Sequence, residues 1–497
     1  MGQSCQIVDA YDQSTASSLD GRTFTFAVGL GAAFEPGVLV TISTEQGWRY
    51  LGQVESAYLH IPDGRPRSLR GSGRLYRRFQ SRDLQELEES YCRPGGRFTA
   101  AKIDRASDAT IQQLYAGAYG ERDLRPLPIG RVLDAAPTTE VAVSASALLR
   151  HTLVCGQSGS GKSFALGVML EQLLLRTQFR LVVLDFNGDF ARLNFLLSRE
   201  LIQARGPHAC MSQEVFHGIQ QSWREVAPRI LILSRNGVRP SKEYLSLPMS
   251  MVPVSVLAAA MGLEQGASPG AYNVLTQLLR TYPRQTHPRM LSEKLRDGAS
   301  ASALELIQRM ENAGILDWSV WKDVHRSLSE DLVHQSYQAI VLDLNSLPSR
   351  DERMVVALSV LDVLWTQRQT RRPTIIVTDE VHNLCRRDPS DALERLGQRY
   401  LTTLAKEGRK FLLSLLSATQ VPRSLPEDVL TQMASVVLMR MPSMAELEYL
   451  SGSVLDAHVE MVARAKSFRA GESLIAGSLV PCPTMCKFYS RLTPEGR

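Results

Sequence analysis

The sequence predicts an α/β protein: a parallel sheet with helices on both faces, preceded by a small β-barrel and carrying a helical insertion. Short alternating runs separated by Gly and Pro fill the first part of the chain and indicate the barrel. Uniformly apolar runs alternate with helical patterns from Leu148 onward and indicate buried parallel strands. Between about 198 and 338 the apolar spacing is mostly helical. We therefore expect a barrel domain at 1–138 and a sheet domain at 139–497.

The amino-terminal strands are predicted from alternation of apolar and polar residues. Such runs cover 23–28, 38–42 and 50–54, with turn residues between them at Glu35-Pro36-Gly37 and Gln46-Gly47. A segment rich in proline, 126–137, follows. It places the domain boundary between Ala135 and Val141.

The strands of the sheet domain are predicted from short apolar runs that have no polar face. These runs are 152–155, 181–184, 230–233, 340–342, 375–377 and 411–413. Parallel strands in one sheet bring their carboxyl ends to a common edge, where such folds bind ligands. Polar residues that directly follow these runs are therefore the candidate site residues.

The most specific motif follows the first of these runs. Its spacing is G-x-x-x-x-G-K-[ST], and it consists of Gly156, Gln157, Ser158, Gly159, Ser160, Gly161, Lys162 and Ser163. The backbone N–H groups of such a loop surround a phosphate, and the helix that follows adds its positive end. We expect Lys162 to neutralise the β- and γ-phosphates and Ser163 to bind Mg²⁺. The motif predicts a nucleoside triphosphate site, and the lack of an N-K-x-D motif disfavours GTP.

Two acids end the apolar run 375–377. Asp379 is expected to hold the Mg²⁺ shell, and Glu380 to orient and deprotonate the attacking water. Asp185 and Asp189 follow the run 181–184 and could reach the metal-bound water or couple the nucleotide to a moving loop. The alternative for this second pair is a tight Asn-Gly turn.

Three further residues are candidates for completing the site. Gln420 follows the expected strand that begins at Phe411 and is placed to sense the γ-phosphate. Arg409 is a candidate arginine finger acting across a subunit boundary, and Arg150, just before the phosphate-loop strand, is a second one. The alternative for each arginine is a solvated surface charge.

Net charge, cysteine content and the length of the apolar runs limit the class of protein that this chain can be. The chain has 497 residues and a net charge of +5, which permits contact with nucleic acid without demonstrating it. Its seven cysteines are scattered and are expected to be reduced thiols. No signal peptide is recognised, and the longest apolar runs are shorter than the about 20 residues that a bilayer requires. We expect a cytoplasmic protein without a membrane anchor.

A basic stretch at 65–82 stands out within the barrel region. Its arginines are Arg65, Arg67, Arg70, Arg74, Arg77, Arg78 and Arg82. We interpret it as a flexible insertion. It could be a solvated loop, a docking surface for a partner or a guide for DNA.

Four motifs in order resemble the HerA/FtsK branch of P-loop ATPases. Besides the phosphate loop, 185–190 resembles D-P-x-G-E-[YF], 379–384 resembles the D-E-A-H-N element of HerA, and 407–410 with 418–422 resembles E-G-R-K and A-T-Q-R-P. The predicted barrel is similar to the one that HerA proteins share with rotary ATP synthase subunits. Three positions depart from the pattern: Phe186 replaces Pro, Asp189 replaces Glu and Val421 replaces Arg.

The resemblance implies a RecA/FtsK-like core that forms a hexameric ring, uses ATP and Mg²⁺, and moves duplex DNA through its pore. It also implies a separate effector: a NurA-like nuclease, another nuclease or a sirtuin-like NAD-degrading enzyme, in DNA-end processing or anti-phage defence. Two alternatives remain open. One is an ATP-gated assembly scaffold or sensor that activates an effector with little translocation, and the other is a conjugation- or secretion-type motor.

Overall fold

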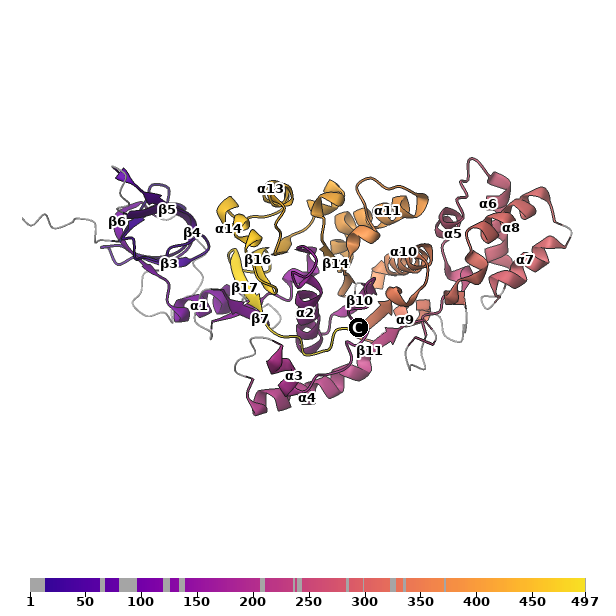
Figure 1. The fold of residues 1–497 in the computed structure, drawn as a ribbon, viewed down its shortest axis with the longest axis horizontal. Coiled ribbons are helices and arrows are strands. Elements are labelled where there is room, and N and C mark those ends of the chain that lie inside the picture. Colours follow the sequence, from indigo (N-terminus) through magenta and orange to yellow (C-terminus); the bar gives the residue numbers. More distant parts are fainter. Residues whose placement is uncertain are drawn as a thin grey trace, which may run out of the picture.

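The computed structural model describes residues 14–62, 68–79, 96–118, 126–133, 139–205, 211–235, 237–238, 244–282, 286–297, 299–321, 328–333, 337–370 and 372–496. The molecule is elongated, with the barrel at one end, the large sheet in the middle and a group of short helices at the other end (Figure 1). The predicted fold class is confirmed.

Six strands form a closed barrel in the order β1-β2-β5-β4-β3-β6. They are β1 (Thr15–Ser18), β2 (Thr23–Val28), β3 (Leu39–Ser43), β4 (Arg49–His60), β5 (Ser68–Phe79) and β6 (Phe98–Arg105). Alternate residues point inward, as the sequence pattern predicts, so that Phe24, Phe26, Val40 and Ile42 are buried in a common core.

The basic stretch is not a flexible insertion where the structure describes it. Residues 68–79 form strand β5, which pairs with both β2 and β4. Arginines fit this strand because its inward positions are taken by small or apolar residues: a Cβ at Gly73 would lie 2.4 Å from the Phe24 ring. Arg74 pairs with Glu55, and Arg78 stacks on the Trp48 ring. Arg65, Arg67 and Arg82 lie outside the described residues.

The second sheet has eleven strands in the order β11-β12-β10-β13-β14-β9-β15-β16-β17-β7-β8. The strands from β11 to β15 run parallel, and those from β16 to β8 pair antiparallel. Their bounds are β7 (Leu127–Val132), β8 (Glu140–Val143), β9 (Thr152–Cys155), β10 (Arg180–Asp185), β11 (Ile230–Leu233), β12 (Ala339–Asp343), β13 (Thr374–Thr378), β14 (Leu413–Thr419), β15 (Ser435–Met439), β16 (Glu472–Gly477) and β17 (Thr484–Phe488).

Two of these strands differ from what the sequence pattern suggests. Strand β7 lies within the range expected for the barrel, yet it pairs with β17 in the large sheet. Only the last residue of the apolar run 411–413 belongs to a strand: Phe411 ends a 3-10 turn, Leu412 has a φ of 61°, and β14 begins at Leu413. Periodicity alone does not reveal that left-handed residue.

Both faces of the parallel strands are buried, which explains their uniformly apolar sequences. Along β12, Ile340 and Leu342 belong to one core cluster, whereas Ala339 and Val341 belong to the other. Helix α2 covers one face, and α10 and α11 cover the other (Figure 1).

The helices are mostly short. Their bounds are α1 (Asp108–Ala118), α2 (Lys162–Arg176), α3 (Arg199–Ala204), α4 (Gln213–Val226), α5 (Val254–Ala260), α6 (Pro269–Thr281), α7 (Pro288–Arg296), α8 (Ala301–Asn312), α9 (Leu328–Val333), α10 (Arg350–Thr366), α11 (Ala392–Glu407), α12 (Glu427–Leu430), α13 (Met444–Ser453) and α14 (Val459–Ala463). Helices α5 to α8 form the group beyond the sheet (Figure 1). None of the helices in the described ranges combines the length and apolar character that crossing a bilayer requires.

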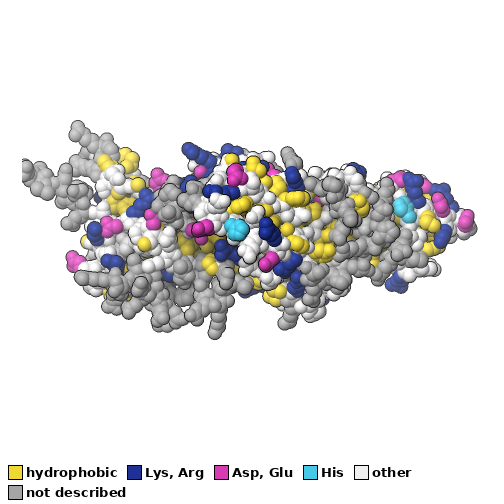
Figure 2. Space-filling view, turned by 90° about the horizontal axis from the view of Figure 1, so that it is seen from below, with side chains coloured by type: hydrophobic (Ala, Val, Ile, Leu, Met, Phe, Trp, Pro, Cys, Tyr) yellow, Lys and Arg dark blue, Asp and Glu magenta, His cyan; other side chains and the backbone are white. Residues whose placement is uncertain are grey.

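Helices α3 and α4 form the lower edge of the molecule in Figure 1. Seen from below, the part of this side that the structure describes carries apolar and charged side chains mixed together (Figure 2). In and next to α3 and α4, the exposed apolar residues include Phe195, Leu201 and Val215.

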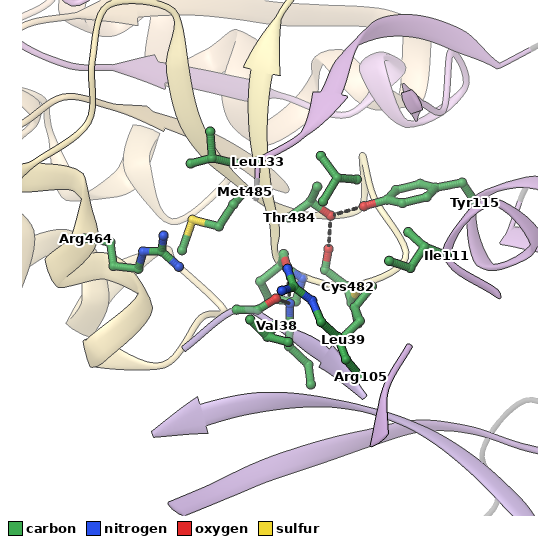
Figure 3. Close-up of a pocket in the computed structure, with 14 residues that line it drawn as sticks. Val38, Leu39, Arg105, Ile111, Tyr115, Leu133, Arg464, Cys482, Thr484 and Met485 are labelled. Carbon is green, nitrogen blue, oxygen red and sulfur yellow. Dashed lines mark hydrogen bonds between the residues drawn. The ribbon is translucent and has the colours of Figure 1, made fainter. Parts of the chain in front are cut away.

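The barrel is joined to the sheet through polar contacts around a small pocket (Figure 3). Gln53 of β4 donates from Nε2 to the Pro483 carbonyl at 2.7 Å, next to β17. Tyr115 of α1 and Thr484 of β17 share a hydroxyl hydrogen bond of 2.6 Å. The Gln53 contact thus links the barrel, and the Tyr115 contact links α1, to the segment at the start of β17.

Candidate active site at the carboxyl ends of the parallel strands

The phosphate loop, residues 156–163, connects β9 directly to α2. Its Gly156 N–H donates to the Thr419 carbonyl at the end of β14, so the loop is fixed to the neighbouring strand. Gly159 and Gly161 have φ values of 71° and 99°, which side chains rarely adopt. These turns leave Ser158 exposed and place Ser163 in the first turn of α2.

Lys162 is buried at the first position of α2. Its Nζ donates to the Gln157 carbonyl at 3.3 Å, across the loop. Burial lowers the pKa of Lys162, and the negative charges of Glu380, Asp379 and Asp189 oppose that shift. The loop lysine and the acids predicted to act with it therefore share one electrostatic environment.

Glu380, which follows β13, is held by side chains from two neighbouring segments. Gln420, which follows β14, donates from Nε2 to Glu380 Oε1 at 2.6 Å. Nδ1 of His382 lies 3.2 Å from the other oxygen, Oε2, and 3.3 Å from the Thr419 hydroxyl. Oε2 is buried and has no aligned hydrogen-bond donor. The carboxylate is thus fixed at one oxygen and available at the other.

His382 is suited to remain neutral beside this acid. Burial lowers the pKa of His382, and the positive charges of Arg386 and Lys162 add to the effect while Glu380 opposes it. A neutral imidazole can accept at one ring nitrogen and donate at the other. Nδ1 is the ring nitrogen that lies near both Glu380 Oε2 and the Thr419 hydroxyl, and a neutral His382 adds no fixed positive charge there.

The carboxylates of Asp379 and Asp185 also hold the turn at 186–190 by accepting hydrogen bonds from its backbone. Asp379 accepts from the N–H groups of Phe186 and Asn187 at 2.9 Å each. Asp185 accepts from three N–H groups of the turn, and Gly188 has a φ of 80°. The Asn-Gly turn is therefore present, and it links the end of β10 to the end of β13.

These two acids are crowded in a buried region. Burial raises the pKa of Asp185 to about 7, and the charges of Asp343 and Asp189 add to it. Burial also raises the pKa of Asp379, with Asp185 and Glu380 contributing. A cation near these carboxyls would relieve the repulsion among them.

The two candidate arginine fingers lie at the opposite edge of the sheet. Arg150 directly precedes His151 and β9, Arg409 lies just before β14, and both side chains are exposed. The seven residues of β14 separate Arg409 from Gln420, a span of roughly 20 Å at about 3.3 Å per residue. Within one chain neither arginine can complete the site that contains Glu380.

The residues present fit a magnesium nucleotide. Two buried oxygens at the site have no hydrogen-bond partner, Ser160 Oγ in the phosphate loop and Glu380 Oε2. The loop has the glycines and the helix start that phosphate binding requires. The Ser163 hydroxyl and the Asp379 carboxylate would hold the Mg²⁺ ion, which supplies positive charge to the phosphates.

Sequence reasoning did not include His382 or Thr419 among the site residues. The signal for His382 was its position two residues after Glu380, because a short turn brings such neighbours together. Thr419 directly precedes Gln420, and its hydroxyl also accepts from the Val421 N–H at 3.1 Å. This bond orients the segment that carries Gln420.

Residues 127–361 match the family described as the central domain of the helicase HerA. The chain is 20% identical over 417 residues to the DNA double-strand break repair helicase HerA of Sulfolobus acidocaldarius, covering 80% of this chain and 76% of that protein. It is 21% identical over 438 residues to the protein of the same name from Pyrococcus furiosus, covering 78% and 72%.

Solved structures with a similar arrangement include the bacterial conjugative coupling protein TrwB. That structure has a TM-score of 0.47 and 13% identity, with 78% of this chain and 94% of that chain covered. VirB4 of Thermoanaerobacter pseudethanolicus has a TM-score of 0.46 and 13% identity, with 73% and 96% covered.

Proposed function

Because this chain is a distant homologue of the archaeal HerA helicases over most of its length, we propose that it is an ATP-driven motor that moves duplex DNA. The relatives are named as helicases of DNA double-strand break repair, which supports DNA as the moving substrate. The positive net charge is compatible with that role.

The observation that carries the proposal is the state of the Glu380 carboxylate. Its Oε1 is fixed by Gln420 while Oε2 is buried without a donor, next to the phosphate loop that contains Lys162. A general base needs a fixed position and a free lone pair toward the proton that it accepts. We propose that Oε2 takes a proton from the water that attacks the γ-phosphate, while Lys162 stabilises charge on the phosphate oxygens.

We propose that the motor works as a closed ring of identical subunits. Arg150 and Arg409 lie roughly 20 Å from Gln420 across the sheet of their own chain, so they can reach only the site of a neighbour. A ring built head to tail would bring the amino edge of one sheet to the carboxyl edge of the next. Six subunits are expected from the HerA resemblance.

We further propose that the motor serves a separate effector, a nuclease or an NAD-degrading enzyme, in DNA-end processing or anti-phage defence. The repair role in the names of the relatives supports the first setting. Purification of the native complex and identification of the copurifying chain tests this part. A motor that translocates DNA with no stable partner would count against it.

The motor is tested by ATP turnover with and without DNA. We expect duplex DNA to stimulate turnover, and Glu380→Gln to lower it by about 10²–10⁴-fold while nucleotide binding is retained. Lys162→Ala should instead weaken nucleotide binding. An ATP turnover rate that duplex DNA does not change would favour the scaffold or sensor. Stimulation of ATP turnover by single-stranded DNA alone would favour a conjugation-type motor.

A further inference from the structure

A second cluster of positive charge lies at the amino edge of the sheet, away from the phosphate loop. Three arginines line a cavity of about 40 Å³ there: Arg180 at the start of β10, Arg372 just before β13, and Arg368 after α10. Thr374 and Gln367 add polar groups to its wall. The cavity exceeds the roughly 10–15 Å³ that a single water needs.

Each guanidinium is only partly satisfied by the protein. Arg180 donates from Nη2 to the Asp331 carbonyl at 3.2 Å, Arg372 from Nη2 to the Tyr337 carbonyl at 3.3 Å, and Arg368 from Nη1 to the Trp365 carbonyl at 2.8 Å. Arg180 Nε, Arg372 Nη1 and Arg368 Nε are buried and have no partner. An unpaired buried donor is costly, and more so on a charged group.

Charge neutralisation is missing as well. Across the described residues, none of the three arginines forms an ion pair with a carboxylate, and Arg180 is only 6% exposed. Burial lowers the pKa of Arg180 to about 10, with the charge of Arg372 adding to it, and Arg229 acts on Arg372 in the same way. Arg180 is buried, and Arg372 and Arg368 are half-buried. Buried charges are normally paired, so this group of like charges favours a counterion.

The aromatic neighbours account for only part of this arrangement. The Arg368 guanidinium lies 4.5 Å from the Trp365 ring centroid and 5.3 Å from that of Phe411, which stabilises its charge. No such ring contact is found for Arg180 or Arg372 in the part of the chain that the structure describes. Their unpaired N–H groups need an acceptor with several oxygens, and guanidinium groups match phosphate oxygens well.

We propose that this cavity is a second anion site, which binds a tetrahedral oxyanion such as phosphate between Arg180, Arg372 and Arg368. It is distinct from the phosphate loop, because Arg180 and Asp185 are the two ends of the six-residue strand β10 and lie about 16 Å apart at about 3.3 Å per residue. The phosphate is either free in solution or the terminal phosphate of a strand. The site does not depend on the proposed motor activity.

The test uses the full-length Lys162→Ala protein, so that the phosphate loop contributes little binding. Its thermal unfolding is followed in sodium phosphate and in sodium chloride at equal ionic strength. We expect phosphate to raise Tm by on the order of 1–3 °C above chloride. Adding Arg372→Gln should remove this difference, whereas adding Arg395→Gln, an exposed arginine on α11, should leave it.

Arg372 is chosen because it is half-buried, so the variant is expected to fold, which circular dichroism checks. A short DNA duplex with and without a 5′-phosphate distinguishes the two sources. A rise in Tm with free phosphate, or only with the phosphorylated duplex, supports the site if Arg372→Gln abolishes that rise. No rise with either, or a full rise that survives Arg372→Gln, overturns the proposal.

Discussion

The two oxygens of Glu380 show how single side chains set the proposed chemistry. Oε1 accepts a 2.6 Å hydrogen bond from Gln420, so the carboxylate cannot rotate without breaking it. Oε2 faces His382 without an aligned bond. The two oxygens therefore face different neighbours, Gln420 and His382, and each neighbour can be removed separately.

Removal of the Gln420 amide tests positioning alone. In Gln420→Ala the Glu380 carboxylate keeps its charge but loses its anchor, so we expect turnover to fall by about 10–100-fold while ATP binds as before. Steady-state ATPase rates and nucleotide titration measure the two effects. Gln432→Ala, at an exposed position, is the matched control. A Gln420→Ala enzyme as fast as the wild type would show that the anchor is dispensable.

His151 makes the stability of the sheet depend on pH. Its Nδ1 accepts from the Leu415 N–H at 3.0 Å, and burial lowers the pKa of His151 to about 4, with Arg409 adding to it. In the unfolded chain this pKa is about 6.5. The unfolded state therefore binds the proton more readily, and stability that is complete above pH 6.5 is lost as the pH falls toward 4. The loss is at most roughly 3 kcal/mol.

The variant His151→Asn isolates this effect, because an amide oxygen can still accept from Leu415. We expect the stability advantage of the wild type over the variant to shrink between pH 6.5 and 4.5 in urea unfolding. The exposed His217, changed to Asn, is the control and should give a constant difference. A difference for His151 that does not vary with pH would contradict the assignment.

At the level of elements, the segment 490–496 stabilises α2, the helix that begins with Lys162. Glu171 of α2 accepts from the N–H groups of Leu492 and Thr493 at 2.8 and 2.9 Å. Arg491 lies 3.7 Å from Glu171, donates to the Asp189 carbonyl and sits over the Phe190 ring. One segment thus holds both α2 and the turn at 186–190.

A single methyl group tests this contact. A Cβ on Gly167 would lie 2.3 Å from Arg491 Nε, so Gly167→Ala must displace the buried guanidinium. We expect a loss of about 1–3 kcal/mol in the free energy of unfolding. Gly218→Ala on α4, where a Cβ meets nothing within 4 Å, should instead gain about 0.5–1 kcal/mol. Equal effects at both positions would rule out the steric explanation.

The elements differ in how well the sequence alone predicts them. The apolar runs that became β10 and β13 are buried on both faces, so their composition was sufficient. Strand β7 was expected in the barrel because local patterns cannot show that it pairs with β17, more than 350 residues later. The expectation of a flexible insertion is wrong for β5, because Arg70 and Arg74 flank Gly71 and Gly73, which leave room for the barrel phenylalanines. The role of Asp185 in the turn likewise depends on contacts that follow only from the folded chain.

At the scale of the whole molecule, the parallel sheet separates the acids of the candidate site from the two candidate arginine fingers. Asp185 ends β10 and Asp379 and Glu380 directly follow β13, whereas Arg150 and Arg409 precede the amino ends of β9 and β14. A lone chain has an incomplete site at one edge and two exposed arginines at the other. Head-to-tail contact between copies would join these two edges.

Mixed assemblies test this arrangement directly. Arg409→Ala and Glu380→Gln should each be inactive alone. When subunits exchange, an interface between Glu380 of one variant and Arg409 of the other is complete, so we expect mixing to restore part of the ATP turnover. A mixture of Glu380→Gln with Lys162→Ala is the control, because both changes affect the same side of the interface and no complete site can form. If labelled subunits exchange but the first mixture recovers no ATP turnover, Arg409 does not act at the site of a neighbouring subunit, since every other requirement for a complete interface would then be met.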